Sequence, residues 1–304
     1  MKESKVWAIL KNVIKIIITV VALYWVSTKI SFIGLKENLQ DSNPLYLILA
    51  LLFYILSILV ASSRLNSFFK AIGLEITERY NFRLYQLGLL YNFFLPGGIG
   101  GDGYKIFFLK KNFQVSRRKL LGAIFFDRLS GLWALAIISG ALVIFMPRLA
   151  IPNSVTIAAI AIGTISYLYL IRTFFKQFIS NFLITHFKAL CVQGLQTCSA
   201  ICILYAMNYD GKFSPYIFVF MVSSLVAIVP SVGGGFGVRD LAILTLASYL
   251  QLDKHLAVNM GIIFYVISLI VASSGIYYIF RPKRLGTERL PTAKEVEQEI
   301  DNQE

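Results

Sequence analysis

Long apolar runs are the feature that most constrains what this chain can fold into. Several of them approach the roughly 20 residues that a helix needs to cross a bilayer. The chain is 57% hydrophobic and only 15% charged, whereas a soluble domain is nearer to about half apolar and a quarter charged. Backbone that crosses lipid must satisfy its hydrogen bonds internally, so the sequence predicts an all-α polytopic membrane protein.

The apolar runs predict about six transmembrane helices. Their expected ranges are 13–28, 44–62, 120–145, 155–171, 190–207 and 255–280. The first run does not resemble a cleavable signal peptide, because Lys11 and Lys15 lie at its start and no small-x-small cleavage site follows it.

Two shorter apolar runs, 82–95 and 216–229, end in glycine-rich loops. When the loops are aligned on Pro96 and Pro230, the glycines of one copy fall on glycines of the other. The matched pairs are Gly100 with Gly234, Gly101 with Gly235 and Gly103 with Gly237, followed by Lys105 with Arg239. Irregular backbone at membrane depth is tolerated only where protein or water surrounds it. We therefore expect two re-entrant hairpins, with loops at 96–103 and 230–237.

The distribution of Lys and Arg predicts the topology. Basic residues crowd at the N-terminus, at 64–119, at 172–188 and at 281–284, whereas the alternate loops carry fewer. This pattern predicts that both termini are cytoplasmic and that the two hairpins enter from opposite sides. Each half then holds three spans and one hairpin. Because three is odd, the second half is inverted relative to the first.

The predicted organisation has three parts. Residues 1–150 form the first inverted repeat with spans one to three, residues 151–280 form the second with spans four to six, and residues 281–304 form a disordered cytoplasmic tail. The arrangement is that of a cell inner-membrane, multi-pass protein with a site near the bilayer midplane.

Composition and spacing exclude several other classes. The net charge is +13, but the Lys and Arg residues flank apolar spans and form no basic stripe on a soluble domain. We therefore expect no nucleic acid partner. The cysteines Cys191, Cys198 and Cys202 share one apolar span, where packing explains them better than a disulfide or a metal. His186 and His255 have no partner at metal-ligand spacing. We expect no metal, no cofactor and no catalytic residue.

Glycines and ionisable side chains in apolar surroundings are the candidate site residues. A charge at the bilayer centre costs roughly 2.5 to 3.5 kcal/mol even on lenient scales, so each is a functional hypothesis. Helices that restart after the loops would present free N–H groups to an anion. The candidates for substrate binding are Asn92, Gly100, Gly101, Asp102, Lys105, Asp127, Arg128, Gly234, Gly235, Arg239 and Asp240.

Each candidate also has a purely structural alternative. The charged residues can pair with one another, Lys105 can snorkel toward Lys110 and Lys111, and the glycines can simply allow close helix packing. Asn92 is expected to donate to the loop carbonyls. The run from Gly98 to Gly103 spells a dinucleotide fingerprint, but no β-strand precedes it, so a nucleotide cofactor is not expected.

These motifs resemble a known family, the lysylphosphatidylglycerol synthase transmembrane-region proteins, which are flippase-like integral membrane proteins. The residues that carry the resemblance are Asn92, Leu95, Pro96, Gly97, Gly100, Gly101, Asp102 and Lys105, then Asp127 and Arg128, then Pro230, Ser231, Gly233, Gly234, Gly237 and Asp240. Lys105 stands where Arg is common and Asp240 where Glu is common, so a bidentate hold on phosphate at position 105 is lost. The resemblance implies the lipid-moving half of such a protein, without the synthase domain of larger members.

The expected function is lipid translocation through a polar cavity between the inverted halves. Arg128, Arg239 and Lys105 would neutralise the phosphate of an anionic phospholipid or of a glycolipid or polyprenyl-linked head group. Asp102, Asp127 and Asp240 would balance these cations or bind a sugar or amino group. The alternatives are an intramembrane transferase with Asp127 and Asp240 as acid–base groups, and an accessory protein of a glycolipid enzyme. A second copy of the chain is also open as a partner.

Overall fold

A computed structural model describes residues 42–94, 100–146, 149, 151–226 and 238–291. The chain divides into two compact units, Met1–Ser42 and Asn43–Glu304. The first unit lies outside the described residues apart from Ser42. All regular elements of the described residues are helices, which confirms the all-α class.

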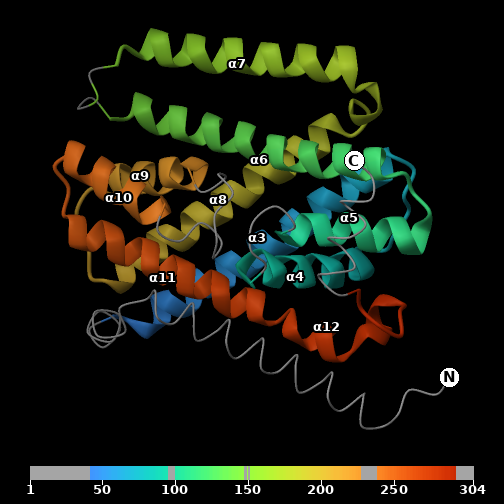
Figure 1. Cartoon of the computed structure of the whole chain (residues 1–304). Coiled ribbons are helices and arrows are strands. Elements are labelled where there is room, and N and C mark those ends of the chain that lie inside the picture. The colour runs from blue at the N-terminus through green and yellow to red at the C-terminus, as the bar shows by residue number, and fades with distance from the viewer. Residues whose placement is uncertain (1–41, 95–99, 147–148, 150, 227–237, 292–304) are drawn as a thin grey trace. The chain divides into compact units, whose positions relative to one another are not determined.

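Five helical segments are long and apolar enough to cross a membrane. They are α3 (Pro44–Ala71), α6 (Arg117–Ile144), α7 (Asn153–Phe174), α8 (Phe182–Ala206) and α11 (Lys254–Ser273) with its continuation α12 (Ile276–Phe280) (Figure 1). These correspond to five of the expected spans. The expected span at 13–28 lies outside the described residues.

Two pairs of shorter helices flank the glycine-rich loops. The first pair is α4 (Glu78–Phe94) and α5 (Gly100–Phe113), and the second is α9 (Phe213–Val226) and α10 (Val238–Tyr249). Within each pair the two helices pack against each other. All four are shorter than the five spans. Each expected break therefore falls between two short packed helices. The first loop was predicted too long, because α5 already includes residues 100–103. Residues 95–99 and 227–237 of the loops lie outside the described residues.

Two helices begin at residues suited to capping. Pro44 occupies the first turn of α3, and the Asn43 side chain accepts a hydrogen bond from Leu45 N at 3.0 Å. At α11 the Asp253 carboxylate accepts from His255 N at 2.8 Å. Caps of this kind stabilise a helix by about 1 kcal/mol. They therefore favour the observed starts of α3 and α11.

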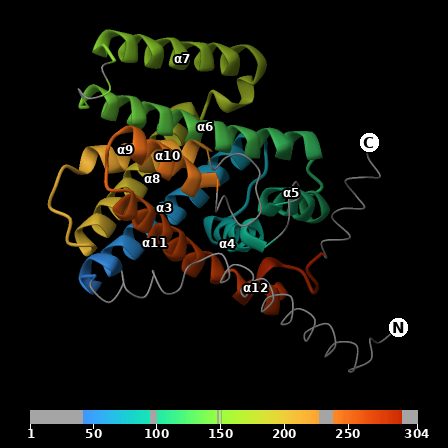
Figure 2. The ribbon, with the colours of Figure 1, turned by 60° about the vertical axis from the view of Figure 1, so that its left-hand side comes forward.

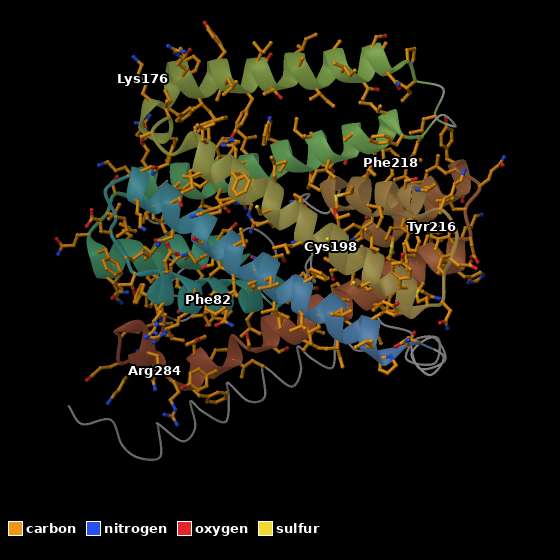
Figure 3. All side chains as sticks on the ribbon, turned by 180° about the vertical axis from the view of Figure 1, so that it is seen from behind. Phe82, Lys176, Cys198, Tyr216, Phe218 and Arg284 are labelled. Carbon is orange, nitrogen blue, oxygen red and sulfur yellow. The ribbon has the colours of Figure 1, made fainter. Side chains whose placement is uncertain are left out.

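The extended contact between α3 and α8 forms the centre of the described unit. Figure 3 shows α8, which carries Cys198, lying alongside α3. Ser199 Oγ donates to Ala50 O at 2.8 Å, and Lys188 Nζ donates to Ser67 Oγ at 2.9 Å. Around this pair, α6 packs against α3, α8 and α9, while α4 and α10 pack against α11. Both hairpins are thereby attached to the same bundle.

Helix α7 lies at the edge of the bundle beside α6 (Figures 1 and 2). In the most apolar stretch of 18 residues of α7, only 11% is buried inside the protein. Trp133 Nε1 on α6 donates to Thr164 Oγ1 on α7 at 3.1 Å. Ile162, Ile165 and Tyr169 are among its exposed apolar residues, as expected of a span that faces lipid.

The segment after the last span packs against the first hairpin. The 3-10 turn η3 (Pro282–Leu285) contacts α4, and both Leu285 and Leu290 are buried. Tyr80 Oη donates to Leu285 O at 3.2 Å, and Arg83 Nη1 donates to Arg284 O at 2.8 Å. Residues 281–291 of the expected disordered tail are therefore ordered, because their apolar side chains reach the core, and residues 292–304 lie outside the described residues.

Shortening Leu285 should loosen this attachment. Leu285 is 1% exposed and belongs to the apolar core around α4 and α5, and such Leu→Ala changes cost about 2 to 5 kcal/mol. We expect Leu285→Ala to lower the melting temperature of the purified protein in detergent. Leu183→Ala is the matched control, since Leu183 is 83% exposed. Equal melting temperatures for the two variants would contradict this packing role.

Candidate functional site

The first hairpin brings the backbones of α4 and α5 into close contact. A Cβ atom on Gly101 would lie 1.7 Å from Gly88 O, so only glycine fits at position 101. Gly100 has a φ of +29°, which also favours glycine. Asn92 Oδ1 accepts a hydrogen bond from Gly101 N at 2.7 Å. Asn92 thus accepts from the start of α5, whereas the sequence led us to expect donation to loop carbonyls.

Asp102 is the centre of a cluster of charges at the start of α5. Its Oδ1 lies 2.7 Å from Lys105 Nζ, and its Oδ2 lies 2.7 Å from Arg128 Nη2. Arg128 Nε also donates to Oδ2 at 2.8 Å. We call Asp102, Lys105 and Arg128 the Asp102 cluster. It joins the first hairpin to the span α6.

The members of the Asp102 cluster differ in exposure. The Lys105 side chain is 5% exposed, that of Asp102 is 27% exposed and that of Arg128 is 56% exposed. Lys105 Nζ also lies 4.9 Å from the centre of the Tyr85 ring. Lys105 is therefore paired and buried and does not snorkel toward Lys110. Arg128 is the member that other molecules can reach.

The charge state of Asp102 follows from its partners. Burial raises the pKa of the Asp102 carboxyl, but Lys105 and Arg128 lower it by more, so the pKa lies well below its usual range. Two close opposite charges favour the ionised form in this way. Asp102 is consequently a fixed carboxylate at neutral pH and is poorly suited to general acid–base work.

Asp127, next to Arg128 on α6, pairs with a different helix. Arg64 Nε on α3 donates to Asp127 Oδ1 at 2.8 Å, and Arg64 Nη2 donates to Oδ2 at 3.2 Å. Each of the two side chains is 7% exposed. Adjacent residues on a helix point in different directions, so α6 connects to α3 through Asp127 and to α5 through Arg128.

Arg64, the partner of the candidate Asp127, was not among the residues that the sequence singled out. The expected second span ended at residue 62, so Arg64 was counted with the polar segment that follows. The helix α3 in fact continues to Ala71 and carries Arg64 into the core. The available signal was that Arg64 is the single charge in residues 44–69, while an aspartate lies in another span. Arg64 Nη1 has no hydrogen-bond partner among the described residues and faces Gly131.

In the second hairpin, Arg239 lies between aromatic rings. Its guanidinium carbon is 4.7 Å from the centre of the Phe220 ring on α9 and 5.0 Å from that of Phe264 on α11. Arg239 Nε donates to Ser223 Oγ at 3.4 Å, and its Nη2 has no hydrogen-bond partner among the described residues. Aromatic faces attract such a cation but leave its N–H groups available.

Asp240 follows Arg239 on α10 and lies near α11. A Cβ atom on Gly261 would lie 3.7 Å from Asp240 Oδ1, so Gly261 gives the carboxylate room. Asp240 is partly buried. The candidates Gly234 and Gly235 lie outside the described residues.

The two copies of the motif place their cations alike. Lys105 and Arg239 each lie against a ring of the preceding hairpin helix, Tyr85 on α4 and Phe220 on α9. They differ in their carboxylate, because the position that matches Asp102 is Phe236 in the second copy. The structure thus gathers Asn92, Gly100, Gly101, Asp102, Lys105, Asp127 and Arg128 around α5 and α6, and Arg239 and Asp240 around α10.

In the described part of the chain, no group of three or more His, Cys, Asp and Glu side chains could hold a metal ion. The cysteines Cys191, Cys198 and Cys202 are free thiols.

Comparison with known proteins identifies the family. The model of one family, described as the lysylphosphatidylglycerol synthase TM region, matches residues 12–274. The chain belongs to this family. The match includes both hairpins and every span from α3 to α11, and it confirms the resemblance carried by the glycine-rich motifs. Membership places the chain among membrane proteins that handle lipid head groups. No curated protein matches the chain at a significant level.

A side chain at position 101 should disrupt the first hairpin. In Gly101→Ala the new Cβ would overlap Gly88 O, and backbone atoms cannot give way cheaply. We expect a strong loss of folded protein, measured as the monodisperse fraction after size-exclusion chromatography. Gly194→Ala on α8 is the control, because a Cβ there meets nothing within 4 Å. If both variants fold equally well, the close contact of α4 and α5 is wrong.

Removing one partner of the Arg64–Asp127 pair should lower stability more than replacing both partners by apolar residues. Removing one partner of a buried pair costs about 3–5 kcal/mol, whereas replacing both by apolar residues is often neutral. We expect Arg64→Met to lower the melting temperature markedly and Arg64→Met with Asp127→Leu to recover most of the loss. A double variant no more stable than the single variant would show that the two side chains are not coupled.

Proposed function

We propose that this protein moves a lipid with a phosphate-bearing head group across the membrane in which it resides. The observation that carries the proposal is the exposure of Arg128. A cation in the middle of a span is costly in lipid and marks a polar path by default. Arg128 is 56% exposed and is held by a carboxylate that also pairs with Lys105. A phosphate can approach it without dismantling the bundle.

The packing of the helices supports two inverted repeats. If α3, α4, α5 and α6 correspond to α8, α9, α10 and α11, each contact among the helices of the first set has a counterpart in the second. The contacts α4–α5 and α5–α6 match α9–α10 and α10–α11. The contacts α3–α6 and α6–α9 likewise match α8–α11 and α11–α4. A pseudo-two-fold arrangement of this kind is typical of transporters whose halves rock about a central site.

The short hairpin helices support re-entrant segments. All four hairpin helices are shorter than the five spans, and α5 and α10 each begin after a glycine-rich loop. Helix starts present positive dipole ends and unpaired N–H groups, which suit anionic groups. With Arg128 beside one start and Arg239 in the first turn of the other, each half would offer one anion-binding position.

Transport accounts for the carboxylates better than catalysis does. A general acid or base must be free to exchange a proton with its substrate. Asp102 is engaged by two cations, and Asp127 is engaged by Arg64 in a bidentate pair. Fixed carboxylates of this kind balance the nearby cations. A transferase, with Asp127 and Asp240 as its acid–base candidates, or an accessory protein of a glycolipid enzyme is the alternative.

The same proposal includes the cellular setting. The positive charges at the N-terminus, in the segments 64–119 and 172–188, and at 281–284 favour cytoplasmic termini and an inner-membrane location. The partner is then a lipid of that membrane.

Removing the cations tests the transport proposal. Purified protein is placed in liposomes with a fluorescent anionic phospholipid, and the labelled lipid that reaches the outer leaflet is measured over time. A hydrogen bond to a charged group contributes about 1.5–3 kcal/mol, so Arg128→Ala and Arg239→Ala should slow transport about tenfold or more. Arg172→Ala, at the exposed end of α7, is the control and should leave the rate unchanged.

Two outcomes would contradict the proposal. Wild-type rates in both arginine variants, with intact protein, would remove the anion-binding role. A covalently altered lipid, found by mass spectrometry after incubation with a lipid extract, would favour the transferase.

A further inference from the structure

Lys105 is the buried member of the Asp102 cluster. Its side chain is 5% exposed, whereas the Arg128 side chain is 56% exposed. Lys105 Nζ lies 2.7 Å from Asp102 Oδ1 and 4.9 Å from the centre of the Tyr85 ring. Lys105 therefore lacks the exposure that direct contact with an approaching anion needs, and Arg128 has it.

The backbone of α4 leaves space for this lysine. A Cβ atom on Gly88 would lie 2.9 Å from Lys105 Cε and 3.2 Å from its Cδ, and these distances are shorter than the separation that carbon atoms prefer. Glycine at position 88 thus lets the lysine stem pass close to α4. The ammonium group is thereby brought to Asp102 from inside the hairpin.

The two oxygens of Asp102 are divided between the two cations. Oδ1 pairs with Lys105 Nζ at 2.7 Å, whereas Oδ2 lies 2.8 Å from Nε and 2.7 Å from Nη2 of Arg128. One carboxylate thus faces two cations, and the Asp102 cluster keeps one positive charge. Without Lys105, Asp102 and Arg128 would form a neutral pair. Lys105 therefore decides whether the exposed guanidinium presents a net charge to its surroundings.

We propose that Lys105 is a positioning residue for anion binding: it compensates Asp102 from within the hairpin and so leaves the positive charge of Arg128 available to an external anionic group. This inference rests on the proposed function and deepens it, because it explains how Arg128 is paired and still attracts an anion. Lys105 acts through Asp102, without contact to the ligand.

The size of the effect follows from Coulomb's law. Lys105 and Arg128 contact the same carboxylate, so an anion on Arg128 lies within several ångströms of the Lys105 ammonium. At the intermediate dielectric constant of a partly exposed site, removing one such charge changes anion affinity by about tenfold. Salt screens the interaction at the exposed guanidinium, so the effect is largest at low ionic strength.

The second copy of the motif lacks this arrangement. Arg239 occupies the position that matches Lys105, but Phe236 stands at the position that matches Asp102. Arg239 lies against the ring of Phe220, 4.7 Å from its centre. An indirect role of the motif cation through this carboxylate is thus specific to the first hairpin.

Four proteins differ in the charges of the cluster and test the inference. The wild type has two cations and one carboxylate, and Lys105→Met has one of each. Asp102→Asn has two cations alone. The double variant, Lys105→Met with Asp102→Asn, has Arg128 alone and so regains the net charge of the wild type.

Arg128 itself serves as the probe. Each purified protein, in neutral detergent micelles at low ionic strength, is treated with phenylglyoxal, which modifies guanidinium groups, and the modified peptides are quantified by mass spectrometry. Dodecyl phosphate is added in increasing mole fraction, and the amount that halves the labelling rate of Arg128 reports its affinity. Arg172, exposed at the end of α7, is the internal control. Its labelling should respond to dodecyl phosphate equally in all four proteins.

The affinities should follow the net charge of the cluster. Lys105→Met should need about tenfold more dodecyl phosphate than the wild type, and Asp102→Asn about tenfold less. The double variant should return to within about twofold of the wild type, because the lost ammonium is offset by the lost carboxylate. A lysine that only supported packing would not be rescued in this way. Melting temperatures are measured in parallel, and Asp102→Asn is decisive if Lys105→Met is unstable.

The outcomes separate this inference from the transport proposal. Equal half-protecting amounts for the wild type and stable Lys105→Met protein would overturn the role of Lys105 and leave that of Arg128 standing. An unchanged amount in Asp102→Asn, or a double variant as weak as Lys105→Met, would overturn it too. A wild-type protein in which dodecyl phosphate protects Arg128 no better than Arg172 would overturn anion binding at Arg128, and with it the proposed function.

Discussion

The structure depends on the pairing of two adjacent residues of α6 with two different helices. Asp127 takes the guanidinium of Arg64 from α3, while Arg128 reaches Asp102 at the start of α5. In a bundle surrounded by lipid, such charges are tolerable only when each has a counter-charge. The first hairpin is thereby linked to α6, which is linked in turn to α3, and α3 packs along α8.

The two hairpins use this support differently. In the first, a carboxylate neutralises Lys105, so that Arg128 is the only member of the Asp102 cluster with more than half of its side chain exposed. In the second, Arg239 is surrounded by Phe220, Phe264 and Ser223, with a phenylalanine at the position that matches Asp102. The two hairpins thus hold their cations in different surroundings, beside a carboxylate in the first and between aromatic rings in the second.

Much of this architecture could be predicted from the sequence, because it follows from strong local signals. Span length, the broken apolar runs and the matched glycines predicted α3, α6 and the short hairpin helices. The pairing partners could not be predicted so easily. The pairing of Arg64 could not be foreseen because α3 continues a further two turns past the expected end. Its contact with Asp127 arises from three-dimensional proximity, which spacing along the chain does not encode.

The contact between Gly101 and Gly88, with Asn92 on the first free N–H of α5, has a further consequence. These contacts lie between α4 and α5 themselves, so the described part of the hairpin needs no ligand to hold its two helices together. A molecule that bound beside these helices would therefore cost the protein little conformational entropy.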